Sequence, residues 1–233
     1  MRDNPELRND LIALGLDPET GHQDGTLNAL AFDLGRTTAD SLLDARRGYQ
    51  VALHGELAGK IMPGQYHYSA LTADGRHYAP LGARFTMANR LQFGSIDALE
   101  DDPGNVPFSK KYFLGGASSV RGWGRYEVSP VGTSGLPIGG NTLFAFSSEL
   151  RATLAGSVGG VLFLDGGNVW EHGWAADLGD LRYAAGIGLR YHTAVGPVRL
   201  DIGQQLNSID GLLVNGEPQK RSWRIHFSIG QAF

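Results

Sequence analysis

The chain is built from short segments in which apolar and polar residues alternate, and this pattern runs through most of its 233 residues. The clearest segment is 181–191, where Tyr183, Ile187 and Tyr191 share one face and small or charged residues share the other. Successive side chains of a β-strand point to opposite faces, so each segment predicts a strand with one apolar and one polar face. About nine such strands follow residue 25, each near the roughly 9–11 residues that a membrane-spanning strand needs. The predicted fold class is all-β.

The first part of the chain lacks this alternation. Residues 5–16 are compatible with a short helix, and the following DPETGHQDG is typical of a loop. We therefore expect an N-terminal loop with a short helix at 1–25 and a β domain at 26–233. The opening residues are too polar for a signal peptide, and no run of about 18 apolar residues predicts a transmembrane helix.

Both a soluble β-sandwich and a membrane β-barrel fit the alternation. The polar faces carry repeated arginines together with Glu149, Asp165 and Asp201, and a barrel would line its polar lumen with such residues. Long and short connections alternate along the chain, as the loops and turns of outer-membrane barrels do. Aromatic residues fall near expected strand ends, where an aromatic girdle would lie: Tyr49, Tyr68, Tyr183, Tyr191, Trp170 and Trp223. These features favour an antiparallel membrane β-barrel meander.

Composition narrows the function classes. The net charge of −4 gives no electrostatic case for a nucleic-acid partner. The chain has no cysteine, which excludes a disulfide scaffold, a thiolate zinc site and a cysteine nucleophile, and suits a protein of the bacterial envelope.

One connection is much longer than the others, spanning residues 97–138. Loops longer than about 15 residues are usually either functional or disordered. The segment Ser119–Trp123 within it combines an aromatic residue, a glycine and a central arginine, which is not the composition of a disordered linker. The sequence therefore predicts an ordered, functional loop.

Several motifs, in order, resemble the BamA/TamA superfamily of outer-membrane assembly and translocation barrels, the bacterial surface antigen type. GGASSVRGW at 115–123 resembles the family's VRG-aromatic loop motif, FLDGGNVW at 163–170 looks like its F-x-D-x-G strand, and 223–233 looks like its C-terminal β-signal. Further similar pieces are RRGY at 46–49, GGN to SELR at 139–151, AGIGLR at 185–190 and VGPVRLD at 195–201. The last of these leans toward the TamA side, and the resemblance covers most of 27–233.

Two departures limit what the resemblance implies. The family's barrel has about sixteen strands, whereas about nine are expected here, and nothing in the chain resembles the family's periplasmic POTRA domains. The chain therefore looks like the later part of a larger barrel, either as a fragment or as a shortened relative. Such a sheet has two open edges, which lipid strongly disfavours.

The resemblance implies that the long loop folds back into the barrel, where Arg121 meets acids on the inner wall. A guanidinium inside a lumen needs carboxylate partners in fork geometry. Asp165 is the first choice of partner and Glu149 the second; the alternative is an exposed loop arginine. The loop-motif residues are Val120, Arg121, Gly122 and Trp123.

The resemblance also implies that the end of the chain is a β-signal, read by the assembly machinery through strand pairing. Its apolar positions are Trp223, Ile225, Phe227, Ile229 and Phe233. The alternative is an amphipathic closing strand with no signalling role.

The function implied by the resemblance is the outer-membrane barrel of a factor that inserts or exports β-rich outer-membrane proteins. Its mechanism would combine a weak seam with a plug-like loop. The expected partners are outer-membrane lipid, unfolded outer-membrane protein substrates and the assembly machinery, with no cofactor. The alternatives are a passive pore or structural barrel, and the barrel anchor of a lipid hydrolase.

Enzyme motifs are not found in the sequence. Ser118 and Ser119 do not lie in a G-x-S-x-G elbow, Gly186 and Gly188 lack the third glycine of a dinucleotide loop, and no H-E-x-x-H metal motif occurs. The acidic turn 100–102 could bind calcium, but such turns are usually only solvated. We expect neither an enzyme nor a metal site, and we expect His226 to be a hydrogen-bonded residue of the lumen wall.

Overall fold

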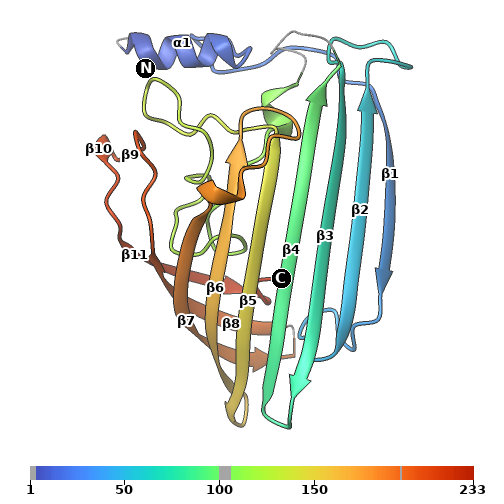
Figure 1. The fold of residues 1–233 in the computed structure, drawn as a ribbon, viewed down its shortest axis with the longest axis vertical. Coiled ribbons are helices and arrows are strands. Elements are labelled where there is room, and N and C mark those ends of the chain that lie inside the picture. Colours follow the sequence, from blue (N-terminus) through green and yellow to red (C-terminus); the bar gives the residue numbers. More distant parts are fainter. Residues whose placement is uncertain (1–3, 100–105, 195) are drawn as a thin grey trace.

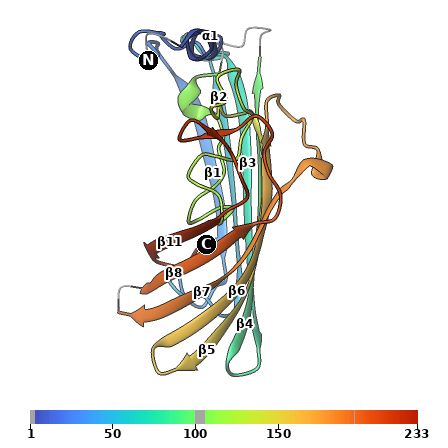
Figure 2. The ribbon, with the colours of Figure 1, turned by 90° about the vertical axis from the view of Figure 1, so that its left-hand side faces the viewer.

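A computed structural model describes residues 4–99, 106–194 and 196–233. Over these residues nine long strands form one antiparallel sheet in the order β1-β2-β3-β4-β5-β6-β7-β8-β11 (Figure 1). Each strand therefore pairs with its neighbours along the chain, which is a meander. The sheet is curved, and it does not close, since β1 and β11 do not pair with each other (Figure 2).

The strands of the sheet are β1 Ala29–Thr37, β2 Gly48–Ala58, β3 Tyr68–Leu81, β4 Phe85–Ala98, β5 Thr142–Ala155, β6 Val158–Trp170, β7 Arg182–Thr193, β8 Gly196–Gln205 and β11 Trp223–Ile229. A small hairpin joins β9 Leu213–Val214 to β10 Glu217–Pro218. The helical elements are α1 Pro5–Ala13 and the 3₁₀ turns Phe108–Lys110 and Leu178–Asp180. No helix among the described residues is long and apolar enough to cross a membrane.

Alternation sorts the strand side chains onto two faces of unlike chemistry. Ile225 and Phe227 on the outer face are 68% and 70% exposed, whereas the inner face of β5 to β8 buries arginines, acids and glycines. Large apolar side chains standing exposed along a whole sheet suit hydrocarbon rather than water. The prediction of an antiparallel barrel meander with about nine strands is confirmed as a fold.

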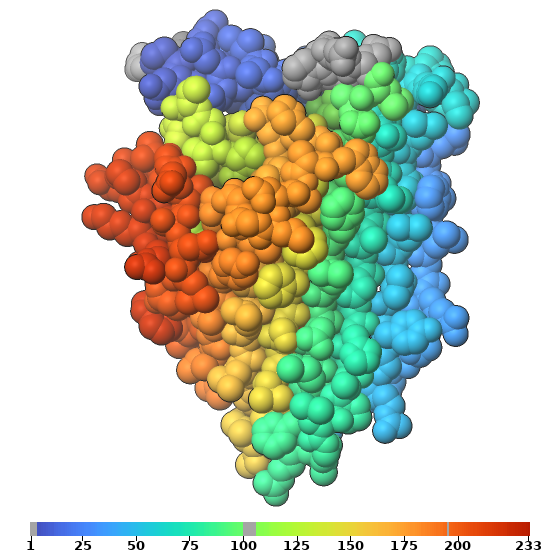
Figure 3. Space-filling view, in the orientation of Figure 1, coloured from blue at the N-terminus to red at the C-terminus, as the bar shows by residue number. Residues whose placement is uncertain are grey.

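The two ends of the sheet carry different connections. The helix α1 and the longest connections lie at one end, and the tight turns 82–84 and 156–157 lie at the other, together with the β1–β2 loop 38–47 (Figure 1). At the first end, Asp10 of α1 accepts hydrogen bonds from the backbone and hydroxyl groups of Thr133 and Ser134. Figure 3 shows this helix against the yellow-green surface of the long loop.

The main apolar core lies between the long loop and the concave face of the sheet. Its loop residues include Val120, Trp123 and Val128, and its wall residues include Val169 and Ala184. The core therefore holds the loop inside the sheet rather than joining the strands to one another.

One girdle residue was wrongly assigned. Tyr68 does not lie on the outer surface; its side chain is fully buried on the inner face, and its hydroxyl donates to Glu56 Oε1 at 2.5 Å. The physical reason is register: Tyr68 pairs with Ala58 and Ala98, whose side chains also face inward and leave room for a ring. Proximity to a strand end did not reveal which face the ring occupies.

Candidate functional site

The connection between β4 and β5 folds back onto the concave face of the sheet. Within its described part, isolated bridges pair Tyr112 with Gly140 and Leu114 with Val128, so that the segment forms a narrow double strand ending in a tip. The tip closes where the Gly116 N–H donates to the Trp123 carbonyl at 3.0 Å.

Glycines bring the tip close to the wall. Gly122 has a φ of 98°, a left-handed conformation that favours glycine, and a Cβ added to it would lie 3.0 Å from the Ala184 Cβ. On the wall, a Cβ added to Gly203 of β8 would lie 2.7 Å from the Gly122 nitrogen. Glycine on both sides thus permits direct contact between the loop backbone and the strand.

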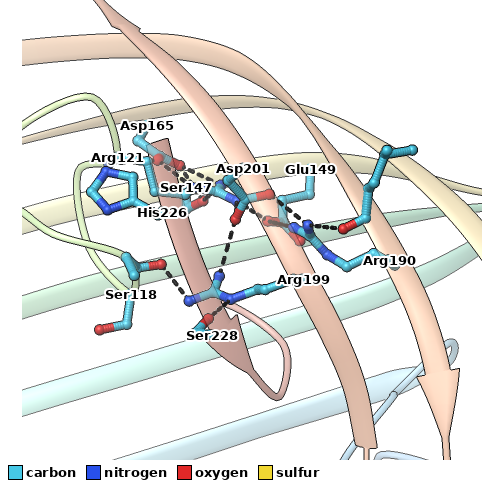
Figure 4. Close-up of polar contacts among 12 residues, drawn as sticks. Ser118, Arg121, Ser147, Glu149, Asp165, Arg190, Arg199, Asp201, His226 and Ser228 are labelled. Carbon is cyan, nitrogen blue, oxygen red and sulfur yellow. Dashed lines mark hydrogen bonds and ion pairs between the residues drawn. The ribbon is translucent and has the colours of Figure 1, made fainter. Parts of the chain in front are cut away.

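This contact places Arg121 in a fully enclosed site, with 0% of the residue exposed (Figure 4). Its Nε and Nη2 donate to the two oxygens of Asp165 at 2.8 and 2.9 Å, and its backbone N–H donates to Asp165 Oδ2 at 3.0 Å. Nη1 donates to Glu149 Oε1 at 2.5 Å. The two acids named from the sequence therefore both contact Arg121, and Asp165 holds it in a bidentate fork.

Three further groups complete the surroundings of Arg121. Asp201 Oδ2 lies 3.5 Å from Nη1, Ser147 Oγ lies 3.3 Å from Nη2, and the Phe163 ring centroid lies 3.6 Å from the guanidinium carbon. Sequence reasoning gave none of these as a partner of Arg121, although Asp201 was counted among the acids of the polar face. Phe163 could have been found, because it is the first residue of the F-x-D-x-G motif.

Strand register explains why these groups converge. Ser147 pairs with Asp165 across β5 and β6, and Glu149 pairs with Phe163 in the next inward row. Gly186 of β7 pairs with Phe163, and a Cβ there would lie 2.9 Å from Phe163 Cε1. The small residues of β7 thus provide the space into which the aromatic ring and the arginine fit.

The lumen site is a network of seven buried charges. It contains four arginines and three carboxylates: Arg121, Arg151, Arg190, Arg199, Glu149, Asp165 and Asp201. Arg151 donates to Glu149 at 2.7 Å and Arg190 to Asp201 at 2.5 Å. Burial alone would lower the pKa of Arg121, but its hydrogen bonds to Asp165 and the nearby negative charges outweigh burial and raise that pKa. Arg121 is therefore permanently charged.

Two arginines, one on β8 and one on β4, donate hydrogen bonds to backbone carbonyls of the loop tip. Arg199 of β8 donates to the Ala117 carbonyl at 2.5 Å, and Arg90 of β4 donates to the Ser118 carbonyl at 3.2 Å. Asp74 fixes Arg90 in turn, accepting from its Nε at 2.7 Å and from its Nη2 at 2.5 Å. The sequence placed both arginines on polar faces but gave neither of them a role in holding the loop.

The loop also contacts β11, the last strand. The Gly122 N–H donates to His226 Nε2 at 3.3 Å. Arg224 donates to Glu127 Oε1 at 2.7 Å, and the other oxygen of Glu127 accepts from the Gly124 N–H at 2.7 Å. His226 therefore faces the lumen and accepts a hydrogen bond, which requires Nε2 to be unprotonated.

The last residues of the chain depart from the expected strand. Trp223, Ile225, Phe227 and Ile229 share the exposed outer face of β11, but Phe233 does not. The chain turns at Gly230, whose φ is 94°, and Phe233 packs inward against Ala45, Tyr78 and Ala88. Burial of the ring against these residues and Arg151, 5.2 Å from its centroid, outweighs continuation of the alternating pattern. The expectation that Phe233 lies on the apolar face was wrong.

No group of three or more histidine, cysteine, aspartate or glutamate side chains among the described residues could hold a metal ion. The acidic turn 100–102, named above as a possible calcium site, lies outside the described residues. The chemistry of the site is suited to holding a loop. The buried cation contacts the three strands β5, β6 and β8, and the loop backbone contacts two more, β4 and β11.

A family model described as the Omp85 superfamily domain matches residues 2–233. The chain belongs to the Omp85 superfamily. Among curated members, the outer membrane protein assembly factor BamA of Nitratidesulfovibrio vulgaris is 25% identical over 202 residues, which cover 85% of this chain and 24% of that protein. BamA of Neisseria meningitidis serogroup B is 25% identical over 236 residues, covering 85% and 28% respectively. This Omp85 chain thus spans about a quarter of the length of these relatives.

The fold is also similar to that of a solved structure. The crystal structure of BamA from Haemophilus ducreyi lacking POTRA domains 1-3 matches with a TM-score of 0.73 at 20% identity. The match covers 93% of this chain and 46% of that one. At this level of identity the likeness concerns the fold alone.

Proposed function

We propose that this Omp85 chain supplies the later strands of an outer-membrane β-barrel that inserts β-rich outer-membrane proteins. Two relatives with similar sequences are outer membrane protein assembly factors, and this supports a role of the same kind. The observation that carries the proposal is the buried Arg121 network, which keeps the long loop against β11 at the open edge of the sheet.

The outer face supports the location. Its exposed large side chains form an apolar surface across the strands, including Phe32, Leu91, Leu162, Ile187 and Phe227. Closed barrels are the only sheets that lipid tolerates without unpaired edges. The sheet therefore requires further strands to cross a membrane.

Strand parity limits the number of strands that could close this sheet into an antiparallel barrel. In an antiparallel meander of nine strands, β1 and β11 run in the same direction, so pairing them directly would create a parallel seam. An odd number of additional strands restores antiparallel pairing throughout. The family's barrel of about sixteen strands meets this condition.

The mechanism rests on β11 as an edge strand. On one side it pairs with β8 over seven residues, and on its other side no described strand pairs with it. The unpaired N–H and C=O groups of an edge strand are a template for an incoming strand. We propose that a substrate strand pairs there, in a step without covalent chemistry, while the loop contacts of Arg224 and His226 hold the edge in place. Trp223 to Phe233 would serve in turn as this chain's own assembly signal.

The experiment exploits the absence of cysteine. The chain, reconstituted in vesicles, carries Ile225→Cys, and a denatured outer-membrane protein carries one cysteine in its last strand. We expect the chain to speed insertion of the substrate and, when a mild thiol oxidant such as copper phenanthroline is added during insertion, to form a disulfide with it. Leu164→Cys, on the same exposed face but on the inner strand β6, serves as the matched control and should not crosslink.

Equal crosslinking at both positions would contradict pairing at the edge. Ion conductance without any acceleration of substrate insertion would instead favour the passive pore.

A further inference from the structure

A second polar feature lies at the end of the sheet that carries the short turns. A cavity of about 330 Å³ opens there between the β1–β2 loop, the ends of β5 to β7, and the tail that follows β11. Asp44 and Arg46 come from the loop, Arg151 and Arg190 from the strands, and Gln231 from the tail. This cavity is separate from the Arg121 contact, since neither Arg121 nor Asp165 lines it.

The lining of the cavity is cationic. Arg46, Arg151 and Arg190 all contribute to it, and Arg190 is only 2% exposed. Asp44 is the one acid among the described lining residues, and it is already engaged. Its carboxylate lies 3.0 Å from His192 Nδ1 and accepts from Gln231 Nε2 at 2.8 Å.

The two buried arginines hold donors that the protein does not use. Among the described residues, Nη1 and Nη2 of Arg151 and Nε and Nη2 of Arg190 find no hydrogen-bond acceptor. Buried guanidinium N–H groups are normally satisfied, because an unpaired donor loses the hydrogen bonds that water would provide. Arg190 Nη2 lies 3.7 Å from Glu149 Oε1, which is an ion pair but too long for a hydrogen bond, so all four groups can still donate to an acceptor from outside the chain.

The balance of buried charges also favours an anion in this cavity. Four arginines share three carboxylates in the lumen, which leaves one positive charge in excess. Glu149 and Asp201 each already accept hydrogen bonds from Arg121 as well as from Arg151 or Arg190. An anion in the cavity would neutralise the excess charge and accept from the unused donors.

We propose that this cavity binds a phosphate group. The tetrahedral oxygens of phosphate can accept from three guanidinium groups approaching from different directions, whereas a carboxylate offers two oxygens in one plane. The volume equals roughly ten waters at about 30 Å³ each, which accommodates a phosphate with part of its hydration. The group belongs either to free inorganic phosphate or to the head of an anionic lipid.

The test titrates inorganic phosphate into the full chain in an uncharged maltoside detergent, with binding followed by calorimetry and ³¹P NMR. Arg46→Gln is the informative variant, because it removes the positive charge and the 2.9 Å contact of Arg46 with Thr153 while keeping a polar side chain at an exposed loop position. Arg47→Gln is the matched control, since Arg47 is adjacent in the same loop but does not line the cavity. We expect saturable binding that Arg46→Gln weakens about tenfold and Arg47→Gln changes less than about twofold.

The absence of saturable binding, or an equal loss in both variants, would overturn the proposal. Acetate that binds as tightly as phosphate would overturn the assignment to phosphate. Repeating the titration in phosphatidylcholine vesicles with and without phosphatidylglycerol identifies the source. Weaker phosphate binding in the presence of phosphatidylglycerol assigns the site to a lipid headgroup, and unchanged binding assigns it to the free anion.

Discussion

The inner faces of the early and late strands carry similar residue types in very different surroundings. On β5, β6 and β8 the inward acids Glu149, Asp165 and Asp201 are fully buried beneath the loop. On β1 the inward Asp33 side chain is 80% exposed, and the strand is exposed along nearly its whole length. The loop, and not the curvature of the sheet alone, therefore buries the concave face.

This difference in burial changes how much an ion pair contributes to the stability of the folded protein. Arg76 and Asp74 of β3 lie 2.8 Å apart with side chains 31% and 16% exposed, so water screens their attraction. Arg121 and Asp165 lie at the same distance with no exposure. In a buried network, loss of one partner leaves uncompensated charge. The predictions below test this contrast between the early and late strands.

Removal of the central cation should have the largest effect. Arg121→Ala leaves the buried Asp165 without the arginine that it pairs with, and we expect it to destabilise loop docking by about 3–5 kcal/mol. Arg76→Ala, the control on β3, should cost less than about 1 kcal/mol. Limited proteolysis of the loop measures docking, with circular dichroism to show that the sheet remains. A loop in Arg121→Ala that resists protease as well as wild type would contradict the role of the network.

Adding a side chain where the loop contacts the wall should have an intermediate effect on loop docking. An alanine at Gly203 would place its Cβ 2.7 Å from the Gly122 nitrogen, and we expect a loss of about 1–3 kcal/mol in loop docking. At Gly75 of β3 the nearest atom is Leu91 O at 4.0 Å, so Gly75→Ala should leave docking unchanged. Hydrogen exchange of amides 115–124 measures loop docking in the two variants. Equal protection of these amides in Gly203→Ala and Gly75→Ala would show that loop docking does not require close approach at Gly203.

The smallest effect is expected where α1 meets the loop. Burial tends to raise the pKa of Asp10, but hydrogen bonds from Ser134 and then Thr133 outweigh it and hold that pKa below its ordinary value. The stabilising contribution is therefore complete above about pH 4 and is lost as the pH falls through the lowered pKa. Hydrogen exchange of residues 5–13 should rise at low pH relative to residues 142–155, and this response should be absent in Asp10→Asn. The same pH response in both proteins would assign it to another group.

The local alternation of apolar and polar residues was sufficient to predict the strands, because its period of two depends only on the geometry of the strand backbone. It was sufficient also for the outward positions Ile225 and Phe227, which follow the alternation of a single strand. Tyr68 and Phe233 were misplaced for related reasons. Tyr68 lies at a strand end and Phe233 beyond one, where the pattern no longer constrains a side chain and the available space decides.

The partners of Arg121 show most clearly what the alternation of residues in the sequence does not predict. The sequence indicated that Glu149, Asp165 and Asp201 share the polar face, but alternation alone does not align strands along their axes. Register places Ser147 opposite Asp165 and Glu149 opposite Phe163, and only then is the pocket for a guanidinium defined. Arg90 and Arg199 reach loop carbonyls for the same reason, through a fold that brings β4 and β8 to opposite flanks of the tip.

By itself, then, the sequence determined the strands, their apolar and polar faces, the family, and the loop arginine with its two first acids. The strands and their faces depend on residue type and on spacing within one segment, whereas the family and the two acids follow from the order of motifs along the chain and from the resemblance to that family. The tertiary structure alone decided that a third acid, an aromatic ring and two flanking arginines complete the site, that Phe233 turns inward, and that Arg151 and Arg190 keep donors without an acceptor beside it. Those features depend on distances between strands and loops far apart in the chain, which only cross-strand register and the path of the loop establish.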